Sequence, residues 1–198
     1  MKLTDITLNE AALILDIPNA RQIVQAIAKV ESNGTGILKD GRLKILFEGH
    51  IFWRQIKLWG ANPEKVKGHE DVLYPKWTRI HYVGGAGEWG RWSKAVKLCK
   101  SLKIPTAAAL DSASYGMFQT MGFNFRSCGY SSSHEMIADY NTGQHAMVLA
   151  VCKLIKNEGW IKYLNPPDWP KFAFHYNGPG YKENDYDTKL ETAFHYFS

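Results

Sequence analysis

Glu31 is the residue whose place in the sequence points most directly to chemistry. It follows Ala20, Ile23 and Ile27 at spacings of three or four residues, so its carboxyl group falls on the apolar face of a helix expected over residues 20–31. Burial on that face disfavours the charged carboxylate, and so does the partial negative charge at a helix C-terminus. A carboxyl group that stays protonated near neutral pH is what a general acid requires. The alternative is a glutamate at a frayed helix end that turns into solvent.

A second carboxylate is needed if Glu31 acts on a sugar bond, because glycosidases normally place one acid on each side of the scissile bond. Glu48 lies 17 residues further along, in the second arm of a possible hairpin that could fold back over the end of the helix. Asp40 and Asp111 are the alternatives. Asp40 is also an ordinary turn residue, and Asp111 could simply cap a helix.

The elements that position these residues are predicted to be mainly α, in an α+β fold with one small β element. Asp40 lies in a tight turn, and its flanks predict a β-hairpin near residues 36–48. Asn33 and Gly34 are expected to end the preceding helix. No linker or repeat divides the chain, so residues 1–198 are expected to form a single domain. Apolar periodicity and capping residues predict helices over residues 8–16, 20–31, 50–60, 88–102, 106–111, 115–120, 133–140, 143–157, from Asp168 onward, and 186–197.

The composition excludes several classes of function. A net charge of +5 suggests a polyanionic partner, but the basic residues are scattered, so nucleic acid is not expected. Cys99, Cys128 and Cys152 are far apart and odd in number, which favours core thiols. The seven histidines show no zinc-binding spacing, so no metal site is expected. We find no signal peptide and no apolar run of about 18 residues, which predicts a soluble chain without stable membrane insertion.

The glycines at Gly85, Gly87 and Gly90 follow a strand-like run and precede a helix, which is the order of a dinucleotide-binding unit. Glu88 would then lie beside the pyrophosphate, and Arg91 would stand where a small residue is needed. The remaining chain also lacks the alternating strands of a parallel sheet. A glycine-rich loop that leads into an ordinary helix is the preferred interpretation.

Four separated motifs resemble those of the phage N-acetylmuramidase endolysins and their bacterial relatives. In chain order they are AIAKVESNGTG, DGRLKILFEGH, SASYGMFQTMGFNF and FAFHYNGPGYKENDYDTKL. The resemblance runs from about residue 3 to the C-terminus and implies a lysozyme-like helical fold with a small β-hairpin. It implies one catalytic domain without the separate wall-binding domain that many relatives carry. The chain departs from the family at Gly49, because FEGH replaces the usual FERH and an arginine contact is missing.

The resemblance makes Glu31 the catalytic general acid. Glu48 is then the first choice for the residue that positions water or stabilises the oxocarbenium-like transition state, and Asp111 is the second. YNGPGY is similar to the Y-N-x-G motif of goose-type lysozymes and lytic transglycosylases, which implies that Tyr176 and Asn177 approach Glu31.

A second segment, YGMFQTMG, is similar to the segment that lines the sugar cleft in those enzymes. It implies that Ser114, Tyr115 and Gln119 contact the substrate. Simple packing is the alternative for the residues of both segments.

The implied activity is hydrolysis of the β-1,4 bond between N-acetylmuramic acid and N-acetylglucosamine in peptidoglycan glycan strands. A lytic transglycosylase that leaves 1,6-anhydro ends is the alternative, and a catalytically inactive wall-binding module is a third. No cofactor or metal is implied, and a monomer is expected. The implied setting is host lysis: synthesis in the host cytoplasm, then action on the periplasmic wall once a separate partner has permeabilised the membrane.

Overall fold

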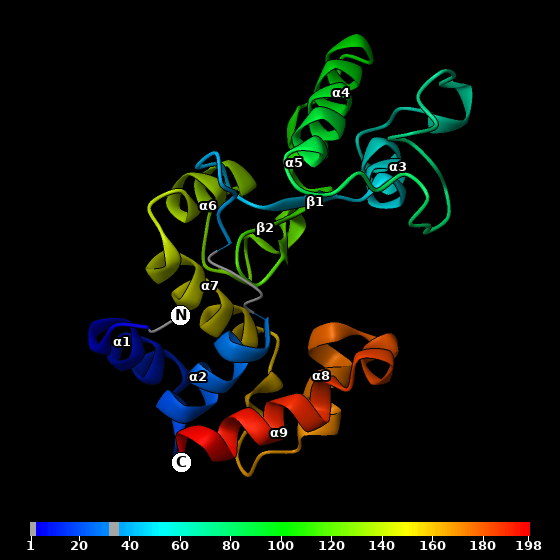
Figure 1. Cartoon of the computed structure of the whole chain (residues 1–198). Coiled ribbons are helices and arrows are strands. Elements are labelled where there is room, and N and C mark those ends of the chain that lie inside the picture. Colours follow the sequence, from blue (N-terminus) through cyan, green and yellow to red (C-terminus); the bar gives the residue numbers. More distant parts are fainter. Residues whose placement is uncertain (1–2, 32–35) are drawn as a thin grey trace. The chain divides into compact units, whose positions relative to one another are not determined.

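The computed structural model describes residues 3–31 and 36–198, and its elements are labelled in Figure 1. The predicted helix end at Asn33 and Gly34 lies outside the described residues. The predicted mainly helical class, with a small antiparallel β element, is confirmed. The helices are α1 (Asp5–Leu15), α2 (Ala20–Glu31), α3 (Gly49–Leu58), α4 (Gly87–Ser101), α5 (Ala107–Leu110), α6 (Ser133–Tyr140), α7 (Gln144–Asn157), α8 (Trp169–Asn177) and α9 (Tyr186–Phe197). Short 3-10 turns are η1 (Pro63–Lys65), η2 (Gly122–Asn124), η3 (Trp160–Tyr163) and η4 (Pro179–Asn184).

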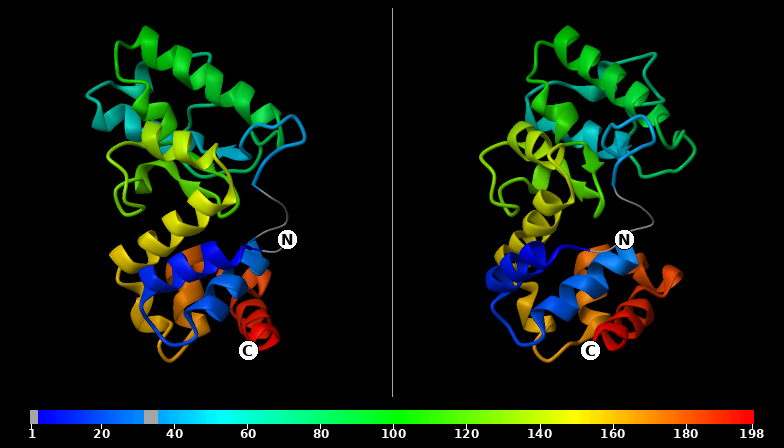
Figure 2. Two further views of the ribbon diagram at one scale, coloured as in Figure 1. Left: turned by 90° about the vertical axis from the view of Figure 1, so that its left-hand side faces the viewer. Right: turned by 60° about the vertical axis from the view of Figure 1, so that its left-hand side comes forward.

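The described residues form two compact units. Residues 3–31, 127–129 and 142–198 make unit 1, and residues 36–126 and 130–141 make unit 2. In unit 1, α2 packs against both α1 and α9, α1 packs against α7, and α8 packs against α9. Figure 2 shows α2 and α9 side by side. The end of α2, where Glu31 lies, is therefore held by helices from both ends of the chain.

Helix α1 begins earlier than its capping residues predicted. Thr4 is the N-cap, and its hydroxyl accepts a hydrogen bond from the Thr7 amide at 3.2 Å. Thr7, the predicted cap, lies inside the helix, where its hydroxyl is buried and bonds to His145 Nδ1 at 3.0 Å. The prediction was wrong by one turn because two threonines three residues apart offer the same capping signal.

Unit 2 is built on a three-stranded antiparallel sheet in the order β1 (Ile45–Phe47), β2 (Ala113–Tyr115) and β3 (Thr120–Met121). Ile45 is opposite Tyr115, and Phe47 is opposite Ala113. The predicted local hairpin is reduced to a single bridge, between Ile37 and Leu43. Strand β1 pairs instead with β2, which is distant in sequence, and this pairing carries Glu48 to the edge of the sheet.

The helix predicted over residues 115–120 is wrong, because this segment turns between β2 and β3. Gly116 (φ 73°) and Gln119 (φ 47°) both adopt left-handed backbone conformations, which interrupt a helix. The helix predicted over residues 88–102 is α4, and its buried face is not wholly apolar. Its buried face carries Glu88 and Arg91, together with Ala95, and the tryptophans flank that face.

The remaining helices match their predictions closely. Ser132 caps α6 by accepting from the Glu135 amide at 3.1 Å, and Asp168 caps α8 by accepting from the Lys171 amide at 3.1 Å. Helix α7 is largely buried, as expected for a central helix. All three cysteines are free and buried, which confirms them as core thiols. None of the described helices is both long and apolar enough to span a bilayer.

Candidate active site

Glu31 is the last residue of α2 and is partly buried. Burial raises the pKa of its carboxyl group, and the hydrogen bond from Asn177 offsets part of that rise. Asn177 Nδ2 donates to Glu31 Oε1 at 3.0 Å. The carbonyl oxygen of the Asn177 side chain is buried and has no hydrogen-bond partner among the described residues, so it can still accept one. The pair therefore presents a carboxyl that keeps its proton to a higher pH than an exposed glutamate does, beside an amide oxygen that can still accept a hydrogen bond.

Asn177 reaches Glu31 because it ends α8, which packs on α9, and α9 packs on α2. Gly178 follows with φ 84°, a conformation that suits glycine and ends the helix there. Tyr176 directly precedes Asn177 on α8. Its ring stacks on Phe172 at 5.3 Å and meets the edge of Trp160 at 6.1 Å. The structure thus brings Asn177 to Glu31, and the expected approach of Tyr176 stays a prediction.

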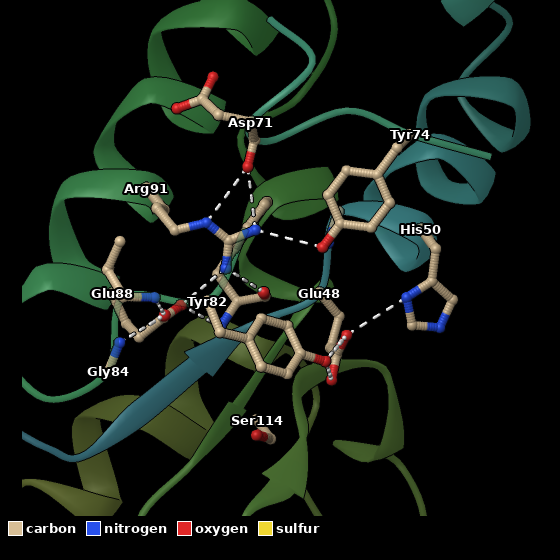
Figure 3. A network of polar contacts seen from close by, with 12 residues as sticks. Glu48, His50, Asp71, Tyr74, Tyr82, Gly84, Glu88, Arg91 and Ser114 are labelled. Atoms are coloured by element: carbon tan, nitrogen blue, oxygen red, sulfur yellow. Dashed lines mark hydrogen bonds and ion pairs between the residues drawn. The ribbon is translucent and has the colours of Figure 1, made fainter. Parts of the chain in front are cut away.

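Glu48 lies in unit 2 at the N-cap of α3, but its side chain does not cap that helix. Instead, the Tyr82 hydroxyl donates to both of its oxygens, at 2.8 and 2.7 Å, as Figure 3 shows. His50 Nδ1 lies 3.2 Å from Oε2, and burial lowers the pKa of this imidazole. Burial raises the pKa of Glu48, while the Tyr82 bond and the charge of Arg91 lower it in part. Glu48 is therefore a carboxylate oriented by a phenol.

Behind Glu48 lies a buried ion pair on α4, in which Arg91 Nη1 donates to Glu88 Oε2 at 2.9 Å. The side chain of Glu88 is 0% exposed and that of Arg91 is 4% exposed. Backbone amides complete the site, because Glu88 also accepts from Phe47, Val83 and Gly84. Although burial alone raises the pKa of Glu88, these hydrogen bonds and Arg91 bring it below the ordinary value.

This pair agrees with the preferred interpretation of the glycine-rich segment as an ordinary loop that leads into a helix. The amides of Val83 and Gly84, next to the glycine motif, are occupied by the protein's own Glu88 carboxylate. Figure 3 shows Arg91 surrounded by its acceptors: Glu88, the Phe47 and Asp71 carbonyls, and the Tyr74 hydroxyl. The loop is thus an internal anion site that supports the fold.

Gly49, the unexplained departure from the family, is explained by Tyr74. A Cβ atom at position 49 would overlap the Tyr74 ring, so only glycine fits beside it. The Gly49 amide donates to the Tyr74 hydroxyl at 3.3 Å, and Arg91 Nη2 donates to the same hydroxyl at 3.2 Å. A tyrosine and an arginine from elsewhere in the chain therefore fill the space beside this position.

The other predicted site residues of unit 2 differ in their surroundings. Asp111 follows α5, where burial raises its pKa and a hydrogen bond from Ser133 lowers it in part. Tyr115 is 0% exposed and donates to the Leu110 carbonyl at 2.9 Å, so it packs in the core and is not retained as a sugar contact. Ser114 is also buried.

Ser114 and Gln119 bond to each other. Ser114 Oγ donates to Gln119 Oε1 at 3.1 Å, and Gln119 Nε2 donates to the Gly116 carbonyl at 2.8 Å. This arrangement fixes the turn between β2 and β3 and leaves the half-buried Gln119 as the more accessible member of the pair. Their predicted contact with substrate stays a prediction.

Sequence reasoning missed Tyr82, His50 and the Glu88–Arg91 pair. The pair had a signal, since opposite charges three residues apart share one helix face. Tyr82 had none, because it lies in a loop with no periodic pattern. Among residues 3–31 and 36–198, no cluster of His, Cys, Asp and Glu could hold a metal ion.

We expect Gly49→Ala to destabilise the protein by about 1–3 kcal/mol, because the Tyr74 ring must move away from its hydrogen bonds to Gly49 and Arg91. Chemical denaturation monitored by circular dichroism measures the change. Gly90→Ala is the matched control, since a Cβ on that α4 glycine meets nothing within 4 Å. Gly90→Ala should be neutral or stabilising, and equal stability of both variants would contradict this explanation of Gly49.

We expect Arg91→Met to lower the free energy of unfolding by about 3–5 kcal/mol, because it leaves the Glu88 carboxylate buried without its cation. Urea denaturation at neutral pH measures the loss. Arg126→Met, at an exposed arginine of the same unit, should change stability by less than about 0.5 kcal/mol. A small effect of Arg91→Met would show that the ion pair does not hold unit 2 together.

Comparison with known proteins identifies the family to which this chain is related. The N-acetylmuramidase family matches residues 20–198, which includes residues of both units. A crystal structure of a Burkholderia AP3 phage endolysin superimposes with a TM-score of 0.84 and 32% sequence identity, covering 98% of this chain and 71% of that one. A search of curated proteins finds no match. The lysozyme-like fold expected from the sequence is therefore confirmed, and the chain belongs to the N-acetylmuramidase family of lysozyme-type glycoside hydrolases.

Proposed function

We propose that this enzyme is a peptidoglycan-degrading endolysin that hydrolyses the β-1,4 bond between N-acetylmuramic acid and N-acetylglucosamine. The observation that carries the proposal is Glu31, whose carboxyl group ends a helix with a raised pKa and a hydrogen bond from Asn177. Such a group can hold a proton near neutral pH and deliver it to the leaving glycosidic oxygen. The family and the similar phage endolysin support this choice of substrate.

The second carboxylate is proposed to be Glu48. It must be ionised to activate water or to stabilise positive charge on the sugar. Burial raises the pKa of Glu48, but Tyr82 and Arg91 both counter that rise by favouring the ionised form, and the phenol of Tyr82 fixes the direction of the carboxylate oxygens. Asp111 is the second choice, because its pKa is also raised by burial and lowered in part by Ser133, but among the described residues no phenol donates to both of its oxygens as Tyr82 does to those of Glu48. The reaction then uses only carboxyl groups of the chain, with no cofactor.

The proposed setting is phage-induced lysis. The chain would be made in the host cytoplasm and would reach the periplasmic wall after a separate partner has permeabilised the inner membrane. Residues 1–198 are proposed to act as one catalytic domain on peptidoglycan glycan strands, as a monomer. This proposal rests on the family and on the similar phage endolysin.

We expect Glu31→Gln to lower the rate of wall cleavage by a factor of about 100–10,000, because the amide cannot protonate the leaving group. Mass spectrometry of digested peptidoglycan should show reducing N-acetylmuramic acid ends with the native enzyme and almost none with the variant. Glu183→Gln, at an exposed glutamate of unit 1, is the control and should cleave at the native rate.

Two outcomes would contradict the proposal. Near-native cleavage by a folded Glu31→Gln variant would remove Glu31 as the acid. Products with 1,6-anhydro ends would assign the chain to the lytic transglycosylases instead.

We expect activity to decline as pH rises through the pKa of Glu31, since the acid must be protonated. Asn177 stabilises the ionised form, so Asn177→Ala should raise that pKa further and move the alkaline limb of kcat/KM to higher pH. The profile is measured on a soluble glycan fragment. Asn157→Ala, whose amide donates only to the Ser127 carbonyl at 2.8 Å, should leave the limb in place. A shift to lower pH in Asn177→Ala would contradict this role.

A further inference from the structure

The segment PKWTRIHYV, residues 75–83, carries the largest group of exposed apolar side chains in unit 2 and is called the Trp77 loop below. Trp77 is 57% exposed, Ile80 is 81% exposed and Val83 is 64% exposed. The loop follows the core residue Tyr74 and leads to the glycines that precede α4. Exposed apolar side chains gathered in one loop mark a surface that contacts another molecule.

The loop is anchored from behind by the buried ion pair. Glu88 accepts from the Val83 amide at 2.9 Å, and the Arg91 guanidinium lies 5.7 Å from the centre of the Tyr82 ring. Within the loop, the Tyr82 amide donates to the Arg79 carbonyl at 3.0 Å and closes a turn. These contacts hold the backbone of the loop while its apolar side chains remain exposed.

Tyr82 connects the loop to Glu48. Its hydroxyl donates to the two carboxylate oxygens at 2.8 and 2.7 Å. Burial and the neighbouring carboxylate both raise the pKa of this phenol, so it remains a protonated donor. The indole of Trp77 lies near enough to the Tyr82 side chain to affect the pKa of the phenol. The residues Trp77, Tyr82 and Glu48 are therefore neighbours, from an exposed ring to a carboxylate.

The chemistry of the Trp77 ring suits a sugar. The Arg79 guanidinium lies 5.3 Å from the ring centre, and the ring is 57% exposed, so a large part of it is accessible to a ligand. A pyranose has one face of C–H groups that stacks on an aromatic ring while its hydroxyls remain hydrated. Lys76 and Arg79 add positive charge beside the ring, which matches the carboxylates of the stem peptides on a peptidoglycan strand and the free lactyl carboxylate of a peptide-free oligosaccharide.

We propose that the Trp77 loop is a glycan-binding subsite in which the Trp77 ring stacks on a sugar of the peptidoglycan strand and Tyr82 is the positioning residue that orients Glu48. This inference rests on the proposed function, because it assigns a role to the second carboxylate of that reaction. A sugar bound on Trp77 also fixes the indole that contacts Tyr82. Substrate binding and the orientation of Glu48 are thereby coupled.

Binding is tested with a soluble tetrasaccharide of alternating N-acetylglucosamine and N-acetylmuramic acid, titrated calorimetrically into the Glu31→Gln protein so that no cleavage occurs. The double variant Glu31→Gln, Trp77→Ala should bind the tetrasaccharide with a Kd about tenfold higher than the Glu31→Gln protein, which corresponds to about 1.4 kcal/mol. Adding Trp59→Ala is the matched control, since Trp59 is 46% exposed and lies outside the loop. It should leave the Kd unchanged.

Positioning is tested by the kinetics of Tyr82→Phe in the otherwise native protein. We expect kcat to fall about tenfold or more with little change in KM, because the ring remains and only the donor to Glu48 is lost. The same loss raises the pKa of Glu48, so the acidic limb of the pH profile should move to higher pH. In a Glu48→Gln background, Tyr82→Phe should have no further effect.

Tyr130→Phe is the control for that variant, because its hydroxyl donates to Asp139 at 2.7 Å instead of Glu48. It should keep the native kcat and pH profile. The inference is overturned if Trp77→Ala binds the tetrasaccharide as tightly as Trp59→Ala, or if Tyr82→Phe leaves both kcat and the acidic limb unchanged. It is also overturned if Trp77→Ala loses affinity for anionic lipid vesicles and not for the glycan.

Failure of the inference can be told apart from failure of the proposed function. A fully active Glu48→Gln protein would remove the role of Glu48 and this inference together, while leaving Glu31 as the acid. An active Glu31→Gln protein would instead contradict the proposed function itself.

Discussion

The cost of removing a carboxyl group from water is the constraint on which this structure depends. A buried carboxylate must be paired and hydrogen-bonded, or it must take up a proton. The chain uses both solutions. Glu88 is fully buried, and Arg91 with three backbone amides keeps it ionised. Glu31 is partly buried and accepts a hydrogen bond from the neutral amide of Asn177, so its proton is retained more easily. One residue type thus serves structure in one unit and, in the proposed function, acid chemistry in the other.

The buried pair in unit 2 also determines where the second carboxylate lies. Glu88 and Arg91 bind the amide and the carbonyl of Phe47, the residue directly before Glu48. The same pair holds the Val83 amide and lies against the Tyr82 ring. The strand that carries Glu48 and the loop that carries its phenol donor are therefore fixed to one ion pair. Loss of that pair would disturb both at once.

Features that depend on neighbouring residues, such as helix bounds, were predicted better than contacts between segments that are far apart in the chain. The bounds of α2, α6 and α9 were clear because apolar periodicity and capping residues act within a few positions. The pairing of β1 with β2 was missed, since it joins segments far apart in the chain and the Asp40 turn suggested a local hairpin. Glu31 and Asn177 were found through motifs. Tyr82 was not found in this way, because it lies in a loop, where no periodic pattern of apolar residues marks its position.

The most direct test of this account is an NMR titration of the glutamate side-chain carboxyls in the intact protein, with assignments confirmed by Glu31→Gln and Glu88→Gln. We predict that Glu31 takes up its proton at a pH above that of an exposed glutamate, and that Glu88 stays ionised to a pH below it. A titration midpoint of Glu31 equal to or below that of Glu88 would contradict the claim that burial and pairing assign these carboxyl groups to different tasks.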